Sequence, residues 1–302
     1  SSIGVDTDFA IIRLDPNGEL DTSWGDLSGA SRTGKTLIDI SDDDFITDML
    51  LDSGNLYVGG YHYNDFVVVR LNASGVLDAS WGDISGSGPS RTGKAIIDIN
   101  GRDDVSNKLL LDSSGNLYAG GFGTNGPSLN QEFAVIRLDA TGVLDASWGD
   151  LSGSGPSRTG KAIIDISGGN DRVVQIILDG SNNIYAGGYG SNGVDDDFAI
   201  VRLDANGELD TSWGDLSGAS RTGKAIIDIS GGNDTAITMI LDSSKLYLGG
   251  KSYNGTNNDF AAIRLDSNGD LDTTWGDLSG ASRTGKAIID ISGYDDTATE
   301  LI

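Results

Sequence analysis

The sequence predicts an all-β fold, a β-propeller of four-stranded blades with about five repeats and one blade incomplete. The first observation is a long internal repeat with one tryptophan in each copy, at spacings of 57, 67, 65 and 62 residues. The second is that the apolar runs are short and separated by Gly, Asn, Asp and Ser, with almost no helical pattern. Sheet units of this period bury their faces only against neighbouring copies. The tryptophans are Trp24, Trp81, Trp148, Trp213 and Trp275.

One copy shows the expected order of the strands. An apolar run ends at Asp112, a Ser-Ser-Gly-Asn turn follows, and a short run closes on the glycine pair Gly120 and Gly121. After a variable loop comes a third run, then a turn at 139–142, the Trp148 loop and a fourth run. Four strands joined by turns are the content of a propeller blade. The expected strands are 105–112, 117–121, 133–138 and 161–166.

The repeated strings Leu-Asp-Ser-Ser-Gly-Asn-Leu-Tyr-Ala-Gly-Gly and Phe-Ala-Val-Ile-Arg-Leu-Asp-Ala-Thr-Gly-Val-Leu-Asp-Ala-Ser-Trp-Gly resemble the delta-60 repeat family of bacterial β-propellers and, more distantly, NHL-type blades. The resemblance covers essentially all of residues 1–302, which we take as a single repeat domain. The chain departs from the family by having Trp where Phe is usual, and by a longer Ser/Gly-rich loop at 83–90. The resemblance implies a fold, since the family offers no general catalytic motif.

The ends of the chain leave one blade short of a strand. Five third strands and five fourth strands can be counted, and five first strands if 298–302 is the last. Only four Leu/Ile-Tyr-x-Gly-Gly second strands occur, at Leu56, Leu117, Ile184 and Leu246. Missing residues, a longer parent chain, or a strand lent by a neighbouring molecule would each explain the deficit. Of these explanations we favour truncation of the chain. The sequence begins with Ser1 and not with methionine, as expected for a chain that has been processed or cut from a longer one.

Charge and composition exclude several classes of function. The chain carries 20 Lys and Arg against 45 Asp and Glu, a net charge of -25. Such a surface repels phosphate backbones and anionic headgroups, so nucleic acid and membrane insertion are not expected. There is no cysteine, hence no disulfide framework, thiolate nucleophile or thiolate metal site. No apolar run approaches the ~20 residues that cross a bilayer.

Most of the scarce positive charge recurs at fixed repeat positions, in the third strand and in each Ser-Arg-Thr-Gly-Lys. We expect the arginines at both positions to bridge to carboxylates of the same or the adjacent blade and so fix the register of the blades, rather than to bind anions or sugars. Those of the third strand are Arg13, Arg70, Arg137, Arg202 and Arg264. We expect the five tryptophans to pack between blades, the alternative being sugar stacking on exposed indoles.

Strand order places the segments that differ between copies on the face opposite the tryptophan loops. They are rich in Tyr, Phe, Asn, Gly and Asp, a composition suited to adaptable polar recognition, although loop drift explains the variation equally well. If a partner binds, this variable face is where we expect it. Its aromatic candidates are Tyr61, Tyr63, Phe122, Tyr189 and Tyr253.

Metal binding and catalysis find little support in the sequence. The acidic runs 42–44 and 195–197 are interpreted as a solvated rim, with Ca2+ as the weaker alternative, because the twelve-residue Asp-x-Asp-x-Asp-Gly loop is absent. His62, the only histidine, is expected to be an ordinary loop residue. We therefore predict no metal site, no cofactor and no enzyme, with carboxylate-pair glycoside hydrolysis as a remote alternative.

The predicted function is that of a bacterial extracellular or cell-surface scaffold that presents its variable face to a protein or glycan, or that polymerises into oligomers or filaments through an unfinished blade. The main alternative is a lectin with one glycan site per blade.

Overall fold

The computed structural model describes residues 6–86, 89–99, 101–125, 129–152 and 156–302. Within those ranges the chain is built of strands and turns and contains no helix, so none that could span a membrane. The chain divides into two compact units, residues 1–119 with 137–144, and residues 120–136 with 145–302. The sheet that contains β9 and β12 has residues in both units.

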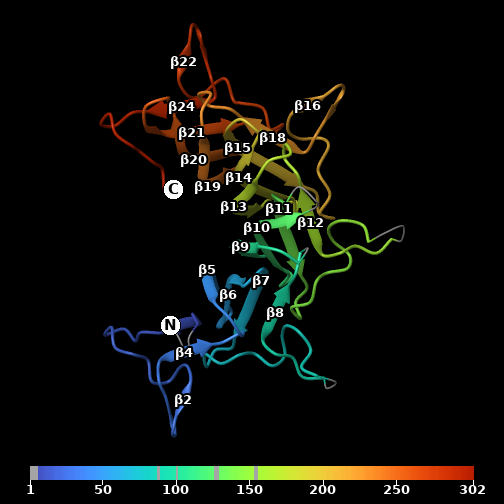
Figure 1. Cartoon of the computed structure of the whole chain (residues 1–302), viewed down its shortest axis with the longest axis vertical. Helices are drawn as coiled ribbons and strands as arrows, with labels where there is room; N and C mark the ends of the chain where they lie inside the picture. Colours follow the sequence, from blue (N-terminus) through green and yellow to red (C-terminus); the bar gives the residue numbers. More distant parts are fainter. Residues whose placement is uncertain (1–5, 87–88, 100, 126–128, 153–155) are drawn as a thin grey trace. The chain divides into compact units, whose positions relative to one another are not determined.

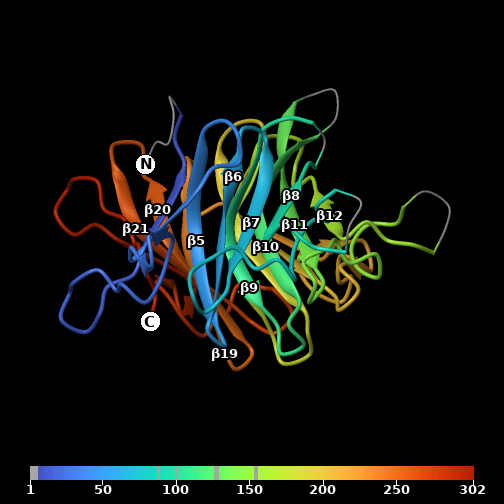
Figure 2. The same cartoon turned by 90° about the horizontal axis from the view of Figure 1, so that it is seen from below.

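Four antiparallel sheets of four strands follow one another along the chain, as the sequence predicts. In Figure 2, β5, β6 and β7 of one of them run side by side. The first of the four sheets contains β5 (Asp44–Asp52), β6 (Asn55–His62), β7 (Asp65–Leu71) and β8 (Lys94–Ile97). The second contains β9 (Asp104–Leu111), β10 (Leu117–Asn125), β11 (Asn130–Leu138) and β12 (Lys161–Ile164).

The other two sheets repeat this order with a small hairpin inserted before the last strand. In Figure 1, the hairpin strand β22 lies beyond β24, away from β19. One sheet contains β13 (Asp171–Leu178), β14 (Ile184–Ser191), β15 (Asp196–Leu203) and β18 (Lys224–Ile227), with hairpin β16 (Leu216–Ser217) and β17 (Ser220–Arg221). The last contains β19 (Asp234–Asp242), β20 (Lys245–Tyr253), β21 (Asn258–Leu265) and β24 (Lys286–Ile289), with hairpin β22 (Leu278–Ser279) and β23 (Ser282–Arg283).

The N-terminal sheet has two described strands, β1 (Phe9–Ile12) and β4 (Lys35–Ile38), with the hairpin β2 (Leu27–Ser28) and β3 (Ser31–Arg32) between them. By sequence these are a third and a fourth strand. At the other end, residues 298–302 are not a strand, contrary to expectation. They nevertheless lie along β20, where the amide of Ala298 donates to the carbonyl of Gly250 at 3.0 Å.

The third strands show how the sheets bury one another. Residues 66–69 of β7 are all fully buried, because both faces of that sheet are covered, and a continuous apolar run is what such a strand requires. In β1 buried and exposed residues alternate, and Ile12 is 61% exposed. One core cluster joins Phe9 and Ile11 of the N-terminal sheet to Val58 and Val67 of the next, so consecutive sheets share a core.

The glycine pair of the second strand packs against the first strand of its own sheet and against the first strand of the next sheet, and neither contact leaves room for a side chain. A register shift between Ile46 and Asp48 brings the first strand so near that a Cβ on Gly60 would lie 1.9 Å from the carbonyl oxygen of Phe45. A Cβ on Gly59 would lie 2.8 Å from Leu109 in the first strand of the next sheet. The Gly-Gly repeat therefore fixes both the bulge and the approach of the following sheet.

Candidate functional site

The first four tryptophan loops each lie against the turn of the following copy. The glycine of that turn covers the indole, and the amide after the tryptophan donates to the turn, as Gly149 does to the carbonyl of Asn206 at 2.8 Å. Trp148 is fully buried under Gly207. Trp24, Trp81 and Trp213 are also buried, so these four indoles offer no free face to a sugar, whereas Trp275 is half-buried.

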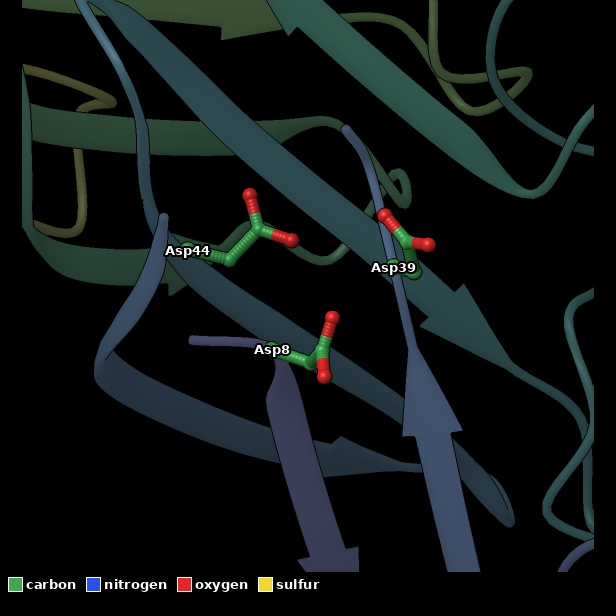
Figure 3. A group of neighbouring side chains, drawn as sticks. All are labelled: Asp8, Asp39 and Asp44. Atoms are coloured by element: carbon green, nitrogen blue, oxygen red, sulfur yellow. The ribbon is translucent and has the colours of Figure 1, made fainter. Parts of the chain in front are cut away.

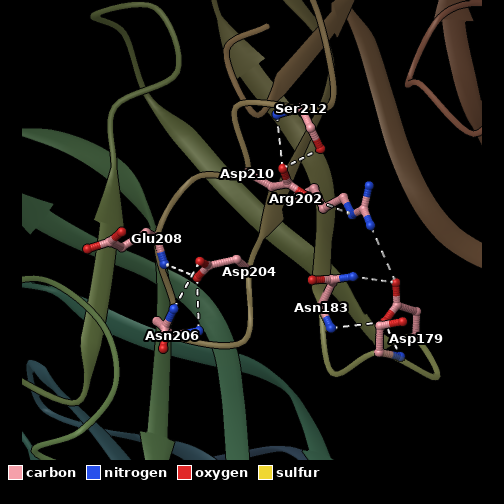
Figure 4. A network of polar contacts seen from close by, with 9 residues as sticks. Asp179, Asn183, Arg202, Asp204, Asn206, Glu208, Asp210 and Ser212 are labelled. Carbon is pink, nitrogen blue, oxygen red and sulfur yellow. Dashed lines mark hydrogen bonds and ion pairs between the residues drawn. The ribbon is translucent and has the colours of Figure 1, made fainter.

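The third-strand arginines pair with the aspartate of the loop in their own sheet. Arg13 lies 3.0 Å from Asp21 and Arg70 lies 2.6 Å from Asp78. Arg202 (to Asp210, 3.4 Å) and Arg264 (to Asp272, 3.0 Å) follow the same pattern, and the Arg137 guanidinium lies 5.6 Å from the ring of Tyr118. Figure 4 shows Arg202 between Asp210 and Asp179, with Ser212 donating to Asp210.

Contacts between copies come instead from the arginine of Ser-Arg-Thr-Gly-Lys. Arg221 donates to both carboxylate oxygens of Asp270 in the next copy, at 2.9 and 2.6 Å, and Arg158 lies 2.6 Å from Glu208. Figure 4 places Glu208 on the turn formed by Asp204 and Asn206. The third-strand arginines thus pair within their own sheet, and it is the second set of arginines that joins one copy to the next.

The aromatic candidates of the variable face differ in exposure. Tyr63 is 71% exposed and Tyr253 is 39% exposed, whereas Tyr61 and Tyr189 are half-buried, and Tyr61 stacks on Phe45. Phe122 is buried, with the Arg172 guanidinium 4.6 Å from its ring centre, so its side chain offers no surface to a partner. Residues 126–128 of the same loop lie outside the described residues.

Sequence reasoning missed five clusters of three carboxylates at the sheet edge opposite the tryptophan loops. Each joins the acid that begins a third strand, the aspartate that follows the fourth strand, and the aspartate at the start of the next copy. In every cluster one oxygen from each residue lies within 4.8 Å of the others. Figure 3 shows the first cluster, Asp8, Asp39 and Asp44. The others are Asp65, Asp98 and Asp104; Glu132, Asp165 and Asp171; Asp197, Asp228 and Asp234; and Asp259, Asp290 and Asp296.

Main-chain amides orient the last aspartate of every cluster, and in the second to fifth clusters they also orient the aspartate that follows the fourth strand. The amide of Ile166 donates to Oδ2 of Asp171 at 2.7 Å, and that of Gly168 donates to Oδ1 of Asp165 at 2.6 Å. The same amides recur in the other copies, for example from Ile229 to Asp234 at 2.6 Å. Main-chain hydrogen bonds thus fix the orientation of these carboxylates, whose oxygens lie close enough together that they could hold a cation.

The clusters differ at the second-strand residue opposite the last aspartate. In the first cluster this residue is His62, whose Nδ1 lies 2.7 Å from Oδ1 of Asp44 and whose exposure is only 9%. His62 is thus a partner of the cluster and not the ordinary loop residue that the sequence suggested. In the third cluster it is Gly190, which lies so close to the cluster that a Cβ there would be 2.8 Å from Oδ1 of Asp171.

Burial, together with repulsion from neighbouring carboxylates, raises the pKa values of five of these acids, Asp44, Glu132, Asp171, Asp197 and Asp234. Burial, followed by the charges of Asp165 and Asp171, raises the pKa of Glu132 to about 7. Burial raises the pKa of Asp171 and that of Asp234 to about 6. Elsewhere the hydrogen bond from Arg221 lowers the pKa of Asp270.

These shifts predict a stability maximum in metal-depleted protein. Carboxylates with raised pKa values destabilise the fold when ionised, so stability should increase as the pH falls from 8 to about 5. Carboxylates with lowered pKa values, such as Asp270, stabilise the fold when ionised, and that contribution is lost below about pH 4. Thermal melts followed by circular dichroism across this range test the prediction. Melting temperatures that fall steadily from pH 8 to 5 would contradict it.

Four segments of the chain, residues 1–23, 52–80, 180–212 and 243–274, match the model of a family described as a domain of unknown function (DUF5122) β-propeller. The matched segments make up less than half of the chain and contain or border the second strands, third strands and following turns. No curated protein matches the chain. The delta-60 name, the number of blades and closure of the propeller stay predictions. The all-β architecture, the four-stranded sheets and these matches together indicate a β-propeller repeat protein.

Proposed function

We propose that the chain is a non-enzymatic scaffold that binds another polypeptide by β-strand addition to the incomplete sheet β1–β4. The observation that carries this proposal is the exposure of the Arg13 side chain, which is 53%, against 15 to 18% for Arg70, Arg202 and Arg264. The difference has a specific cause in the second strand.

In complete sheets, the tyrosine of the second strand lies between the third-strand arginine and the tryptophan. Tyr57 pairs with Arg70 across the strands, the guanidinium lies 5.8 Å from its ring, and its ring meets Trp81 edge-on at 5.9 Å. Tyr185 and Tyr247 do the same in their sheets. Among the described residues, Arg13 and Trp24 have no such tyrosine.

An apolar cleft lies beside β1, which has no second strand next to it among the described residues. It has a volume of about 720 Å3, and its lining includes Ile12, Trp24, Met49 and Leu51. Met49 is 54% exposed and Leu51 is 74% exposed, whereas Leu109, the residue of β9 that corresponds to Met49, is buried. A strand of the form Leu-Tyr-x-Gly-Gly would cover this surface, with main-chain hydrogen bonds to β1 supplying affinity and the tyrosine supplying specificity.

The repeat itself supplies the probe. A peptide with the sequence of residues 116–124 should bind, and titration should change tryptophan fluorescence because Trp24 lies at the cleft. A peptide with valines in place of Gly120 and Gly121 should not bind, since the close approach of neighbouring strands excludes Cβ atoms from the glycine pair.

The matched variants are Leu51→Asp, inside the cleft, and Leu27→Asp, equally exposed on the hairpin β2–β3. We expect L51D to weaken peptide binding at least tenfold and L27D to leave it unchanged. Equal binding of the two peptides, or equal loss in both variants, would overturn the proposal. If the donor is a second copy of this chain, light scattering should show a mass above that of the monomer, and the free peptide should reduce that mass.

A location outside a bacterial cell or on its surface belongs to the same proposal. It rests on the absence of cysteine, the net charge of -25 and the abundance of Gly.

A second candidate function is glycan binding on the variable face. A polar pocket of about 330 Å3 is lined by residues that include Asp196, Asn233, Lys251 and Tyr253. Amide and carboxylate groups beside a partly exposed tyrosine suit a sugar ring. A glycan panel titrated against Tyr253→Ala distinguishes this site from the cleft at β1.

A further inference from the structure

We propose that the five carboxylate clusters bind Ca2+, one ion at each junction between one copy of the repeat and the next. This goes beyond strand addition, because the clusters lie at the opposite end of the strands from Trp24 and need no partner.

The third cluster, Glu132, Asp165 and Asp171, contains a buried carboxylate oxygen that has no hydrogen-bond partner. Glu132 begins the buried part of β11, is only 7% exposed, and its Oε2 is buried without a hydrogen-bond partner. No hydrogen bond to its carboxylate is found among the described residues. A buried carboxylate without a hydrogen-bond donor lowers the stability of the fold, because it has lost its hydrogen bonds to water and forms none with the protein. Its carboxylate lies with those of Asp165 and Asp171, at oxygen separations within 4.8 Å.

The fourth cluster shows the same feature independently. Asn192 donates to Oδ2 of Asp197 at 2.9 Å, while Oδ1 is buried and has no partner. Asp197 is 3% exposed. In two separate copies, therefore, a carboxylate that lies beside two others has an acceptor oxygen that is withdrawn from water and has no hydrogen-bond partner.

The charge near the third cluster is not balanced by protein groups. Lys224 is the cation beside it, and its Nζ donates to the main-chain carbonyl of Asp165 rather than to a carboxylate. One ammonium against three carboxylates leaves a formal charge of -2, which a single divalent cation would neutralise. The same lysine contact recurs between Lys286 and the carbonyl of Asp228, and between Lys94 and that of Asp39 at 2.7 Å.

Spacing and ligand chemistry select calcium. Oxygen ligands lie 2.3–2.6 Å from Ca2+, so two ligands on opposite sides of the ion are about 4.8 Å apart, which spans the separations in the clusters. Mg2+ requires ligands at about 2.1 Å in a strict octahedron and retains its waters. Zn2+ and copper prefer nitrogen and sulfur, whereas all five clusters consist of carboxylates.

The position of the clusters indicates what the ion would do. Glu132 and Asp165 belong to the edge of one sheet, at β11 and β12, and Asp171 begins β13 of the next. An ion held by all three would join consecutive copies at the edge opposite the tryptophan contact. Binding should therefore raise the melting temperature, because the unfolded chain does not hold the three acids together.

Calorimetric titration of CaCl2 into metal-depleted protein at pH 7.5 tests the proposal. The variants are Glu132→Gln and Asp165→Asn in the third cluster, with Glu19→Gln as a control that makes the same change at an exposed acid outside the clusters. We expect about five Ca2+ per chain, and E132Q and D165N should each bind one equivalent fewer than E19Q. Mg2+ at the same concentration should not displace Ca2+.

Thermal melts provide a second measurement that does not depend on the heat of binding. Ca2+ should raise the melting temperature of the wild type and of E19Q, and should raise that of E132Q by less. The proposal is wrong if Ca2+ produces neither heat nor a shift in melting temperature, or if E132Q and D165N bind as much Ca2+ as E19Q does.

Discussion

Trp148→Ala is expected to lower the free energy of unfolding by about 4 kcal/mol, the typical cost of removing a large aromatic side chain from a core. The indole is fully buried, and the turn of the following copy lies directly on it through Gly207. Little of the cavity can collapse, because the amide of Gly149 is also tied to the carbonyl of Asn206. Urea denaturation measures the loss.

Trp275→Ala is the matched control for this prediction. The local loop is the same, with the amide of Trp275 donating to the carbonyl of Asp272 at 3.0 Å, as in the other copies. No glycine turn covers Trp275 among the described residues, and its side chain is half-buried. We expect a loss of about 1–2 kcal/mol. Equal losses in the two variants would show that the copy-to-copy contact contributes nothing to stability.

Gly207→Ala is expected to cost about 3 kcal/mol, from two separate sources. The residue has a φ of +84°, so any side chain incurs about 1 kcal/mol of backbone strain. In addition, its Cβ would lie 2.6 Å from Cε2 of Trp148 and 2.7 Å from the amide nitrogen of Gly149. The turn and the indole must therefore separate, which adds the cost of overpacking.

Gly18→Ala measures the backbone strain alone, without the clash between the turn and a tryptophan. Gly18 occupies the same turn position in the first copy, with a φ of +85°, and nothing lies within 4 Å of where its Cβ would be. We expect a loss of about 1 kcal/mol, from the backbone alone. If G18A and G207A lose the same amount in urea denaturation, the close contact between copies is absent in solution.

The sequence was sufficient for the elements that repeat locally. Strand order and turns follow from short-range patterns, and the structure confirms the four-stranded sheets. The second strand is longer than expected, since β10 continues past the glycine pair to Asn125, and the fourth is shorter, since β12 ends at Ile164 before Asp165. Both differences lie at strand ends, where hydrogen bonding and not side-chain pattern decides the boundary.

The carboxylate clusters could not be found by reading along the chain. Glu132 and Asp165 are 33 residues apart, and only the pairing of Phe133 with Ile164 brings them to the same edge. The acidic runs 42–44 and 195–197 attracted attention because they are dense, yet only Asp44 and Asp197 of those runs belong to clusters. An alignment of the five copies with one another shows an acidic residue at each of these three positions in every copy, and this pattern in the sequence could have revealed the clusters.

Exposure also separates residues that the sequence treats as equivalent. Arg13 and Arg70 occupy the same repeat position, but only Arg70 has a tyrosine beside it, because β1 has no second strand among the described residues. Trp275 and Trp148 differ for the corresponding reason at the other end. The repeat predicts that every arginine of the third strand packs beside a tyrosine and every tryptophan beneath a turn, whereas the structure shows in which copies these partners are present.

Consecutive copies contact each other through a tryptophan at one edge, and we propose that a cation joins them at the other. Anomalous diffraction from a crystal grown with Ca2+, and from a second crystal soaked with a lanthanide, tests it most directly. We expect an anomalous peak among the carboxylate oxygens of Glu132, Asp165 and Asp171, with matching peaks in the other clusters. A map in which Lys224 forms an ion pair with Glu132, and in which no anomalous peak lies in any cluster, would contradict it.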